Sequence, residues 1–183
     1  MIGNDLVDIS EAKKSKHWHT QRYLDKLFTE NEQIIIKESE HRFEMICRLW
    51  SMKESAYKII SRSLNTRFYL PKALECTIEN DINGSVTFDG QDYETQTTAN
   101  NHFLYSIALE NKSKWNSLVS EISTGTSRST LEEKLLSQFN IKDLAIKKVE
   151  YNIPVLTDNK NFYFEQFSLT HHGDFTAYAY LKQ

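Results

Sequence analysis

The feature that most limits how this chain can fold is a long stretch, from Arg42 to Ser63, that contains neither glycine nor proline. Apolar residues return along it at helical spacing, at positions 49, 52, 56, 59, 60 and 64. This period is typical of a helix that buries one face against a core. The stretch therefore predicts a long, half-buried helix, with Glu54 and Lys58 one turn apart on one of its faces.

Patterns on either side of this stretch predict strands. Residues 2–9 are short, apolar and β-branched, while residues 74–78 and 103–109 carry alternating apolar positions. A period of two is typical of strands with one buried face. Asn83-Gly84 is a dipeptide of tight turns, so we expect a hairpin there, followed by a strand at 86–88. The first 111 residues thus predict a strand, helices and an antiparallel meander.

A shorter helix is expected to begin near Glu30. The Thr29 side chain can cap its first turn, and Glu32, three residues later, can reach back to the capping residue. Later in the chain, residues 123–130 are rich in serine and threonine and predict a linker. A helix at 131–139 and strands at 164–169 and 175–181 should follow, with residues 171–174 at the turn between the strands. The fold class predicted is α+β.

Composition and charge restrict the class of protein. The chain has 183 residues, of which 39% are hydrophobic and 26% charged, so one folded domain is expected. The net charge of −3 gives no footprint for nucleic acid. Cys47 and Cys76 have the spacing of neither a disulfide framework nor a zinc site and are interpreted as reduced core thiols. No segment is long enough to span a membrane, and we expect a cytoplasmic protein.

Two acidic residues are candidates for metal binding. Asp5 lies in the first predicted strand and Glu54 on the long helix, and carboxylate oxygens are the ligands that Mg²⁺ prefers. The spacing alone leaves another reading open, because Glu54 and Lys58 at i and i+4 also form ordinary helix-surface ion pairs. Distinguishing the two readings requires the surrounding sequence.

Four short motifs, in one order, resemble the 4'-phosphopantetheinyl transferase superfamily. Residues 2–5, IGND, resemble its G-x-D motif, and residues 28–32, FTENE, its F-(S/T)-x-x-E motif. Residues 49–58, LWSMKESAYK, are similar to W-x-x-K-E-(A/S)-x-x-K, and residues 168–171, SLTH, to S-x-(S/T)-H. The resemblance implies transfer of 4'-phosphopantetheine from coenzyme A to a serine of an apo acyl or peptidyl carrier protein, with release of adenosine 3',5'-bisphosphate.

The motif order resembles the small holo-acyl-carrier-protein synthases, whereas residues 49–109 are closer to the second half of the larger surfactin-synthetase-activating type. Residues 130–181 resemble the end of that type's first half. The resemblance therefore implies two α/β halves, 1–111 and 112–183, that form a pseudo-dimer within one transferase domain. We expect a monomer with its site between the halves; the homotrimer of the small synthases is the alternative.

The resemblance also implies roles for the metal and catalytic residues. Asp5 and Glu54 would hold Mg²⁺ beside the diphosphate of coenzyme A. Glu54, or a water on the metal, would accept the proton of the attacking serine. Lys58 would bind the diphosphate and stabilise the leaving oxygen, and Lys53 would assist with phosphate charge.

Further residues are expected to bind the cofactor. His171 and Thr170 would contact a phosphate of coenzyme A, and Arg48 would compensate for a lysine missing from the stretch Asn152-Ile153-Pro154. His172 is expected to face solvent at a turn, because neighbouring residues on a strand point to opposite sides.

Two further departures from the family pattern affect the metal site and its alternatives. Val7 stands where the larger type has a further acid, and Asp8 stands where the small synthases have one. A non-catalytic relative that binds coenzyme A or a carrier protein stays open, as does a magnesium-dependent nuclease. Carrier proteins are acidic, so a basic docking rim is expected, formed by Lys13, Lys14, Lys16 or Arg22.

Overall fold

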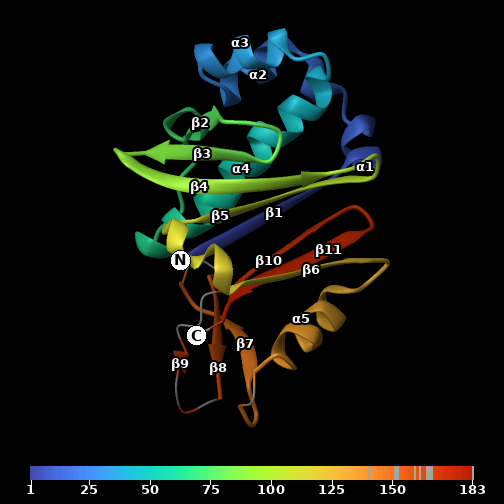
Figure 1. Ribbon diagram of the computed structural model, residues 1–183. Coiled ribbons are helices and arrows are strands. Elements are labelled where there is room, and N and C mark those ends of the chain that lie inside the picture. The colour runs from blue at the N-terminus through green and yellow to red at the C-terminus, as the bar shows by residue number, and fades with distance from the viewer. Residues whose placement is uncertain (140, 151–152, 159, 161, 164–166, 183) are drawn as a thin grey trace.

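The computed structural model describes the chain except for residues 140, 151–152, 159, 161, 164–166 and 183 (Figure 1). The α-helices are α1 (Ile9–Lys14), α2 (Gln21–Leu27), α3 (Glu30–Glu38), α4 (Arg42–Ser63) and α5 (Arg128–Leu136). The strands are β1 (Ile2–Asp8), β2 (Glu75–Ile78), β3 (Asn83–Phe88), β4 (Gln91–Ala99), β5 (Phe103–Leu109), β6 (Leu118–Thr124), β7 (Ala145–Lys148), β8 (Pro154–Thr157), β9 (Phe162–Tyr163), β10 (Phe167–His172) and β11 (Phe175–Leu181). Short 3-10 helices are η1 (Lys16–His19), η2 (Pro71–Ala73) and η3 (Lys112–Ser117). No described helix is long and apolar enough to cross a membrane.

The N-terminal part of the chain forms a five-stranded antiparallel sheet in the order β1-β5-β4-β3-β2. Helix α4 packs along β1 and β5. The helix comes very close to β1 at Gly3, where an added Cβ would lie 2.0 Å from the carbonyl oxygen of Ser55. Glycine at this position is therefore what lets α4 approach the strand that carries Asp5.

The C-terminal part contains two smaller antiparallel sheets, β10-β11-β6 and β7-β8-β9, with α5 packed on β11. Its strand order repeats that of the first sheet. In the first sheet the first strand, β1, pairs with the last, β5, which pairs with β4; in the second, β6 pairs with β11, which pairs with β10. The chain is thus a pseudo-dimer of two α/β units with antiparallel sheets.

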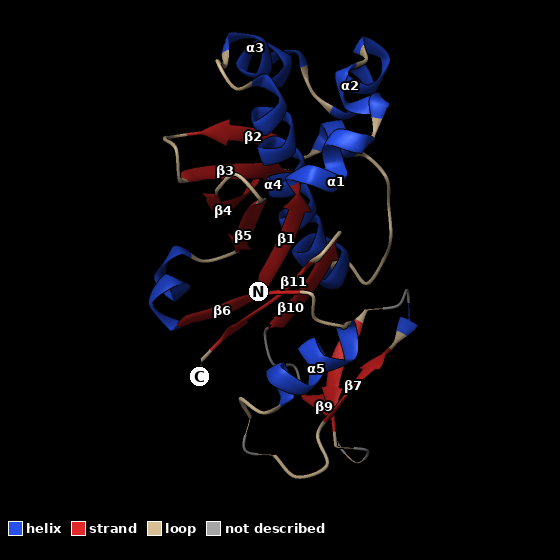
Figure 2. Cartoon of the chain, turned by 90° about the vertical axis from the view of Figure 1, so that its right-hand side faces the viewer, coloured by secondary structure: helices blue, strands red, loops and turns tan. Residues whose placement is uncertain are grey.

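One apolar cluster joins the two units. It contains Ile2, Leu6 and Leu109 of the first sheet together with Ala177 and Leu181 of β11. Strand β1 packs along both β10 and β11, at the junction visible in the middle of Figure 2. We propose to divide the chain after residue 111, because β5 ends at Leu109 and η3 begins at Lys112. We refer to the two parts as the first and second halves.

Several predicted elements are confirmed. The long helix covers Arg42–Ser63, as the pattern predicted, and α3 begins at Glu30. Its capping box is formed as expected, since Glu32 N donates to Thr29 Oγ1 and Thr29 N donates to the Glu32 carboxylate.

Three local predictions are corrected by the structure. Asn83 and Gly84 lie inside β3, with Gly84 opposite Ile78, so the hairpin turn falls at residues 79–82 instead. The predicted linker at 123–130 includes the end of β6 and the start of α5. Strand β10 continues through His172, so the turn occurs at residues 173–174, and residues 164–166 of the predicted strand lie outside the described part.

Candidate active site

The residues expected to form the metal site lie where α4 crosses β1. Lys58 Nζ lies 3.2 Å from Asp5 Oδ1 and donates to the Asn4 carbonyl oxygen at 2.5 Å. The Thr170 hydroxyl, from β10 of the second half, donates to Asp5 Oδ1 at 3.4 Å. Lys58 therefore pairs with the acid of β1, and an ordinary helix-surface pair between Glu54 and Lys58 is not formed.

Glu54 has a raised pKa and differs from Asp5 in its hydrogen-bond partners. Burial and the nearby negative charge of Asp5 raise the pKa of Glu54 to about 7, although the positive charge of Lys58 opposes them. The charge of Asp5 thus acts on the Glu54 carboxylate, as expected for like charges that face one site. The Glu54 carboxylate has no hydrogen bond or ion pair to any described residue. The carboxylate is thus free to accept a hydrogen bond or to bind a cation.

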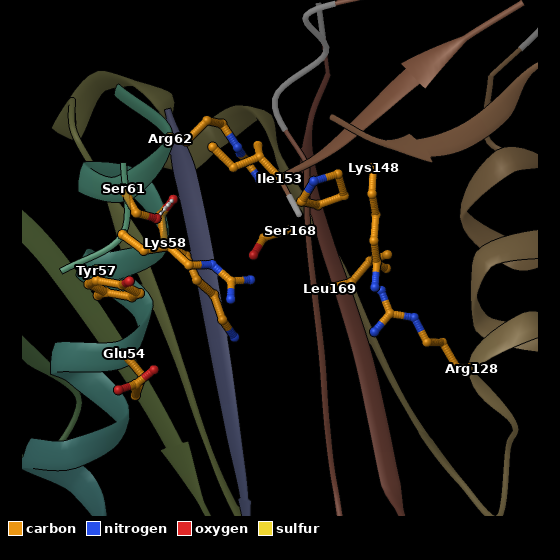
Figure 3. A pocket seen from close by; sticks show the side chains of 12 residues that line it. Glu54, Tyr57, Lys58, Ser61, Arg62, Arg128, Lys148, Ile153, Ser168 and Leu169 are labelled. Atoms are coloured by element: carbon orange, nitrogen blue, oxygen red, sulfur yellow. Dashed lines mark hydrogen bonds between the residues drawn. The ribbon is translucent and has the colours of Figure 1, made fainter. Parts of the chain in front are cut away.

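A cleft of about 480 Å³ extends from Glu54 between the two halves (Figure 3). On one side α4 presents Glu54, Tyr57, Lys58 and Arg62, and on the other side lie Arg128 and Lys148 of the second half. Five cationic side chains line the cleft: Lys58, Arg62, Arg67, Arg128 and Lys148. Glu54 is the single acid among the lining residues. This arrangement favours a ligand with several negative charges.

Arg62 is a cation of the cleft that has a buried donor without a partner among the described residues. Its Nη1 donates to the Ile2 carbonyl oxygen at a long 3.4 Å, and its guanidinium lies 5.8 Å from the centre of the Phe167 ring. Its Nε is buried and has no partner in the described part of the chain. Burial lowers the pKa of Arg62 to about 10. An anion in the cleft would supply the missing acceptor.

A second pocket, of about 220 Å³, is also lined by Glu54 and Tyr57. Its walls are mainly aromatic and aliphatic, with Trp50, Phe68 and Leu70 among them. Leu70 and the adjoining Tyr69 are each 60% exposed. Glu54 therefore lines both a basic cleft and an apolar pocket.

These features agree with the comparison of the sequence with known families. A model of the 4'-phosphopantetheinyl transferase superfamily matches residues 1–110. The chain belongs to this superfamily.

Individual relatives are distant. Holo-[acyl-carrier-protein] synthases from two strains of Rhodopseudomonas palustris, TIE-1 and HaA2, are each 31% identical to the chain over 65 residues, which is 36% of this chain. The matched region spans less than half of these relatives, 44% and 46% of their length. The crystal structure of holo-[acyl-carrier-protein] synthase from Thermotoga maritima superposes with a TM-score of 0.44 at 14% identity, covering 84% of this chain and 83% of that one.

The lysine of the superfamily's K-E pair has a structural position in this member. Lys53 is 2% exposed, and its ammonium donates to Glu32 at 2.7 Å and to the carbonyl oxygens of Pro71 at 2.8 Å and Leu74 at 2.6 Å. All its donors are occupied, since an ammonium has three. This corrects the expectation that Lys53 assists with phosphate charge.

The expected cofactor contact of Arg48 is corrected for a similar reason. Arg48 is 8% exposed, and its Nη2 donates to the carbonyl oxygens of Asn80 at 2.7 Å and Asn83 at 3.2 Å. The side chain therefore supports the turn between β2 and β3 and does not line the cleft. Asn152 of the stretch that it was expected to compensate lies outside the described residues.

The two histidines of β10 differ in their surroundings, and one of them does not lie as expected. His171 is exposed, whereas His172 is half-buried and its Nδ1 accepts a hydrogen bond from Asp8 N at 2.9 Å. The expectation of a solvent-facing His172 is therefore wrong. Thr170 faces Asp5, and His171 shares the other face of β10 with Leu169, which lines the cleft.

The donor set at Asp5 and Glu54 fits a hard cation that takes part of its ligands from elsewhere. No group of three or more histidine, cysteine, aspartate or glutamate side chains that could hold a metal occurs among the described residues. Two carboxylates are nevertheless enough for Mg²⁺ when substrate phosphates and water complete its shell. Asp8 is not available for this role, because its carboxylate caps α1.

Sequence reasoning missed most of the basic lining. Arg62 follows Glu54 and Lys58 by further intervals of four residues, so helical spacing alone would have placed all three on one face. Arg128 and Lys148 carry no comparable signal, because they reach the cleft only through the packing of the second half against the first.

Proposed function

We propose that this protein transfers 4'-phosphopantetheine from coenzyme A to a serine of an apo acyl or peptidyl carrier protein and releases adenosine 3',5'-bisphosphate. The observation that carries the proposal is that Lys58 pairs with Asp5 and that Glu54 and Lys58 line a cleft with four further cationic side chains. Membership of the superfamily supports the same reaction.

Asp5 and Glu54 are the residues that would hold Mg²⁺. When bound, the ion neutralises charge on the diphosphate and orients it for attack. Lys58 lies next to Asp5 and would bind the leaving phosphate oxygen with its ammonium. Glu54, which has no described partner, would accept the proton of the serine hydroxyl, directly or through a water.

The remaining cations would bind the rest of coenzyme A, which carries a diphosphate and a separate phosphate monoester. Arg62 offers a buried Nε without a described partner on one side of the cleft. On the other side Lys148 and Arg128 are exposed, and Arg128 pairs with Glu132 at 2.8 Å. Thr170 and His171 would add polar contacts from β10. A cofactor bound here would touch both halves.

The apolar pocket beyond Glu54 is where we place the acceptor protein. In an in-line displacement the nucleophile approaches from the side opposite the leaving group. If the nucleotide occupies the basic cleft, the serine approaches from the side of Trp50 and Leu70. Lys26, whose ammonium lies 5.1 Å from the Tyr69 ring centre, would attract an acidic carrier at the rim.

The lysines predicted to form a docking rim differ in their availability. Lys14 is paired with Glu11 at 2.6 Å, and Lys13 approaches Glu44 at 3.9 Å, so part of their charge is compensated. Lys16 and Arg22 form no ion pair with a described residue. We retain these last two as rim residues in the proposal, together with Lys26.

The proposal is tested by incubating apo carrier protein, coenzyme A and Mg²⁺ with the protein and measuring the carrier by mass spectrometry. Transfer should add the mass of phosphopantetheine to the carrier. Glu54→Gln should abolish transfer while leaving the circular dichroism spectrum and the melting temperature nearly unchanged. Lys58→Ala should lower kcat by more than about tenfold, equivalent to about 1.4 kcal/mol.

Two outcomes would contradict this proposal. Binding of coenzyme A without any mass increase on fatty-acid, polyketide or peptide carriers would indicate a non-catalytic binding protein. Normal turnover by Glu54→Gln would remove Glu54 from the mechanism. We also propose that one chain holds the whole site, so a light-scattering mass of three chains would contradict the monomer.

A further inference from the structure

Side chains of β10 close the free edge of β1. Strand β1 pairs with β5 on one side only, so alternate amides face outward on the other. Asn4 N donates to Ser168 Oγ at 3.1 Å, and Asp8 N donates to His172 Nδ1 at 2.9 Å. In both pairs the two residues are 164 positions apart in the sequence, so β1 and β10 run in the same direction and keep one register.

These two hydrogen bonds bracket the part of β1 that carries Asp5. Ser168 and His172 lie on one face of β10, and Thr170 lies between them on the same face. The Thr170 hydroxyl meets Asp5 Oδ1 at 3.4 Å, consistent with this register. The position of Asp5 relative to the second half is therefore defined by an anchor on either side.

The anchor at His172 is reinforced around Asp8. One oxygen of the Asp8 carboxylate accepts from the amides of Ser10 and Glu11, and the other accepts from Asp174 N at 3.1 Å. Gly173 lies so close that an added Cβ would be 2.1 Å from Asp8 Oδ2. The tip of the β10–β11 hairpin is thus joined to both the backbone and the side chain of Asp8.

The imidazole supplies the acceptor of an amide in a buried residue. Asp8 is 2% exposed, so the loss of His172 Nδ1 would take away the protein acceptor of its amide. The bond also specifies the form of the ring. Nδ1 has to be unprotonated to accept, so the proton of the neutral imidazole lies on Nε2.

We propose that His172 is a positioning residue for the transfer reaction. Acting through the Asp8 amide, it holds Asp5 of the first half in register with Thr170 and the cleft-lining Ser168 of the second half. The motif histidine, His171, points away from this junction and has no part in it. The proposal rests on the proposed function for its kinetic consequence, but the alignment itself can be measured without transfer.

The kinetic test compares His172→Ala, His172→Asn and a control, His102→Ala, which changes an exposed histidine between β4 and β5. All are assayed below the onset of unfolding. His172→Ala should lower kcat by about tenfold or more, because small misplacements of reacting groups have effects of this size, while KM for the carrier stays unchanged. The carbonyl oxygen of asparagine can accept from Asp8 N, so His172→Asn should stay within about threefold of the wild type. The control should match the wild type.

The second test uses nuclear magnetic resonance and needs no substrate. In the wild type the nitrogen spectrum of His172 should show an unprotonated Nδ1 and a protonated Nε2. In His172→Ala, amide hydrogen exchange should become faster at Asp8 and also at Asn4, the other end of the bracketed segment. This second effect distinguishes alignment of the strand from loosening of the hairpin tip alone.

A folded His172→Ala variant with wild-type kcat would overturn the proposal. So would a protonated Nδ1, failure of asparagine to restore kcat, or faster exchange confined to Asp8 and the hairpin tip. Absence of transfer by the wild-type protein would remove the proposed function instead. The exchange measurement would then decide alone whether His172 aligns the two strands.

Discussion

The buried ion pair between Lys53 and Glu32 gives the sharpest test of how this fold is held together. Lys53 is 2% exposed and Glu32 is fully buried, and their charged atoms lie 2.7 Å apart. Glu32 Oε1 also accepts from Cys76 N at 2.7 Å, while Oε2 accepts from Thr29 N at 2.8 Å. The pair therefore joins α3, α4 and β2 in one network.

Replacing Lys53 with methionine keeps most of the aliphatic volume but removes the charge. The Glu32 carboxylate is then left buried without its counter-ion, and the carbonyl oxygens of Pro71 and Leu74 lose a donor. Breaking a buried pair in this way costs about 3–5 kcal/mol of unfolding free energy. The double variant Lys53→Met, Glu32→Gln should lose less unfolding free energy than the sum of the two single variants, because it leaves no unpaired charge in the core.

Urea unfolding followed by tryptophan fluorescence would give these free energies. KM for coenzyme A should be measured on the same variants at a temperature where each is folded. We expect the stability loss with KM unchanged within about twofold, since the Lys53 ammonium faces the core. A loss below about 1 kcal/mol, or a tenfold rise in KM with unchanged stability, would refute the structural role and restore the phosphate role.

Three further predictions follow from the packing around the site. Gly3→Ala should unfold the protein or lower its melting temperature sharply, because the new Cβ would lie 2.0 Å from Ser55 O, whereas Gly90→Ala, at φ +75 in open space, should cost only about 1 kcal/mol. Arg62→Gln should raise the Kd for coenzyme A about tenfold by calorimetry without loss of stability, because it removes a buried cation with an unpartnered Nε. Burial raises the pKa of Asp8, but hydrogen bonds from Ser10, Asp174 and Glu11 outweigh it and lower the pKa from 3.8 to about 2. The stability that the ionised Asp8 carboxylate contributes should therefore be complete above pH 3.8 and lost as the pH falls through 2. The unfolding free energy of the wild type should thus fall more steeply in acid than that of Asp8→Asn.

The elements that were predictable from sequence are those specified by local rules. The helix Arg42–Ser63 has a strong apolar period and no breaker, and the capping box at Thr29 needs only residues within one turn. Period two likewise revealed β2 and β5. In each case the side chains that decide the structure are neighbours in the sequence, so a short window contains the information.

Local rules were misleading where a tertiary contact decides. Asn83-Gly84 has the composition of a tight turn, yet an added Cβ on Gly84 would lie 2.5 Å from Thr77 O and 2.9 Å from the Met52 methyl. The glycine is needed for close packing of a strand against α4 and not for a turn. Lys53 could not be placed either, because its acceptors Pro71 and Leu74 lie on a segment that only the fold brings near.

The candidate site was predictable in part for the same reason. Asp5, Glu54 and Lys58 lie in motifs that resemble those of a known family. In the structure Lys58 forms an ion pair with Asp5, and the charge of Asp5 raises the pKa of Glu54. Their roles stay predictions. The histidine that touches β1 is His172, one residue beyond the motif histidine, and strand alternation alone could not decide which of the two faces inward.

Equivalent positions in the two halves also explain why the described residues form one candidate metal site and not two. In the second half, Glu121 of β6 pairs with Lys134 of α5 at 2.8 Å, as Asp5 of β1 pairs with Lys58 of α4. The residue one turn before Lys134 is Thr130, whereas the residue one turn before Lys58 is Glu54.

The Glu121 carboxylate also has several hydrogen-bond partners already. Glu121 accepts from Lys134, Tyr178 and Ser123, and hydrogen bonds from these groups lower its pKa against the opposing effect of burial. With neither a second carboxylate nor a free one, this position cannot provide the paired oxygens that a hard cation needs. Among the described charged side chains of the cleft, the second half therefore contributes only cations, Arg128 and Lys148, whereas the first half contributes Glu54 together with Lys58, Arg62 and Arg67.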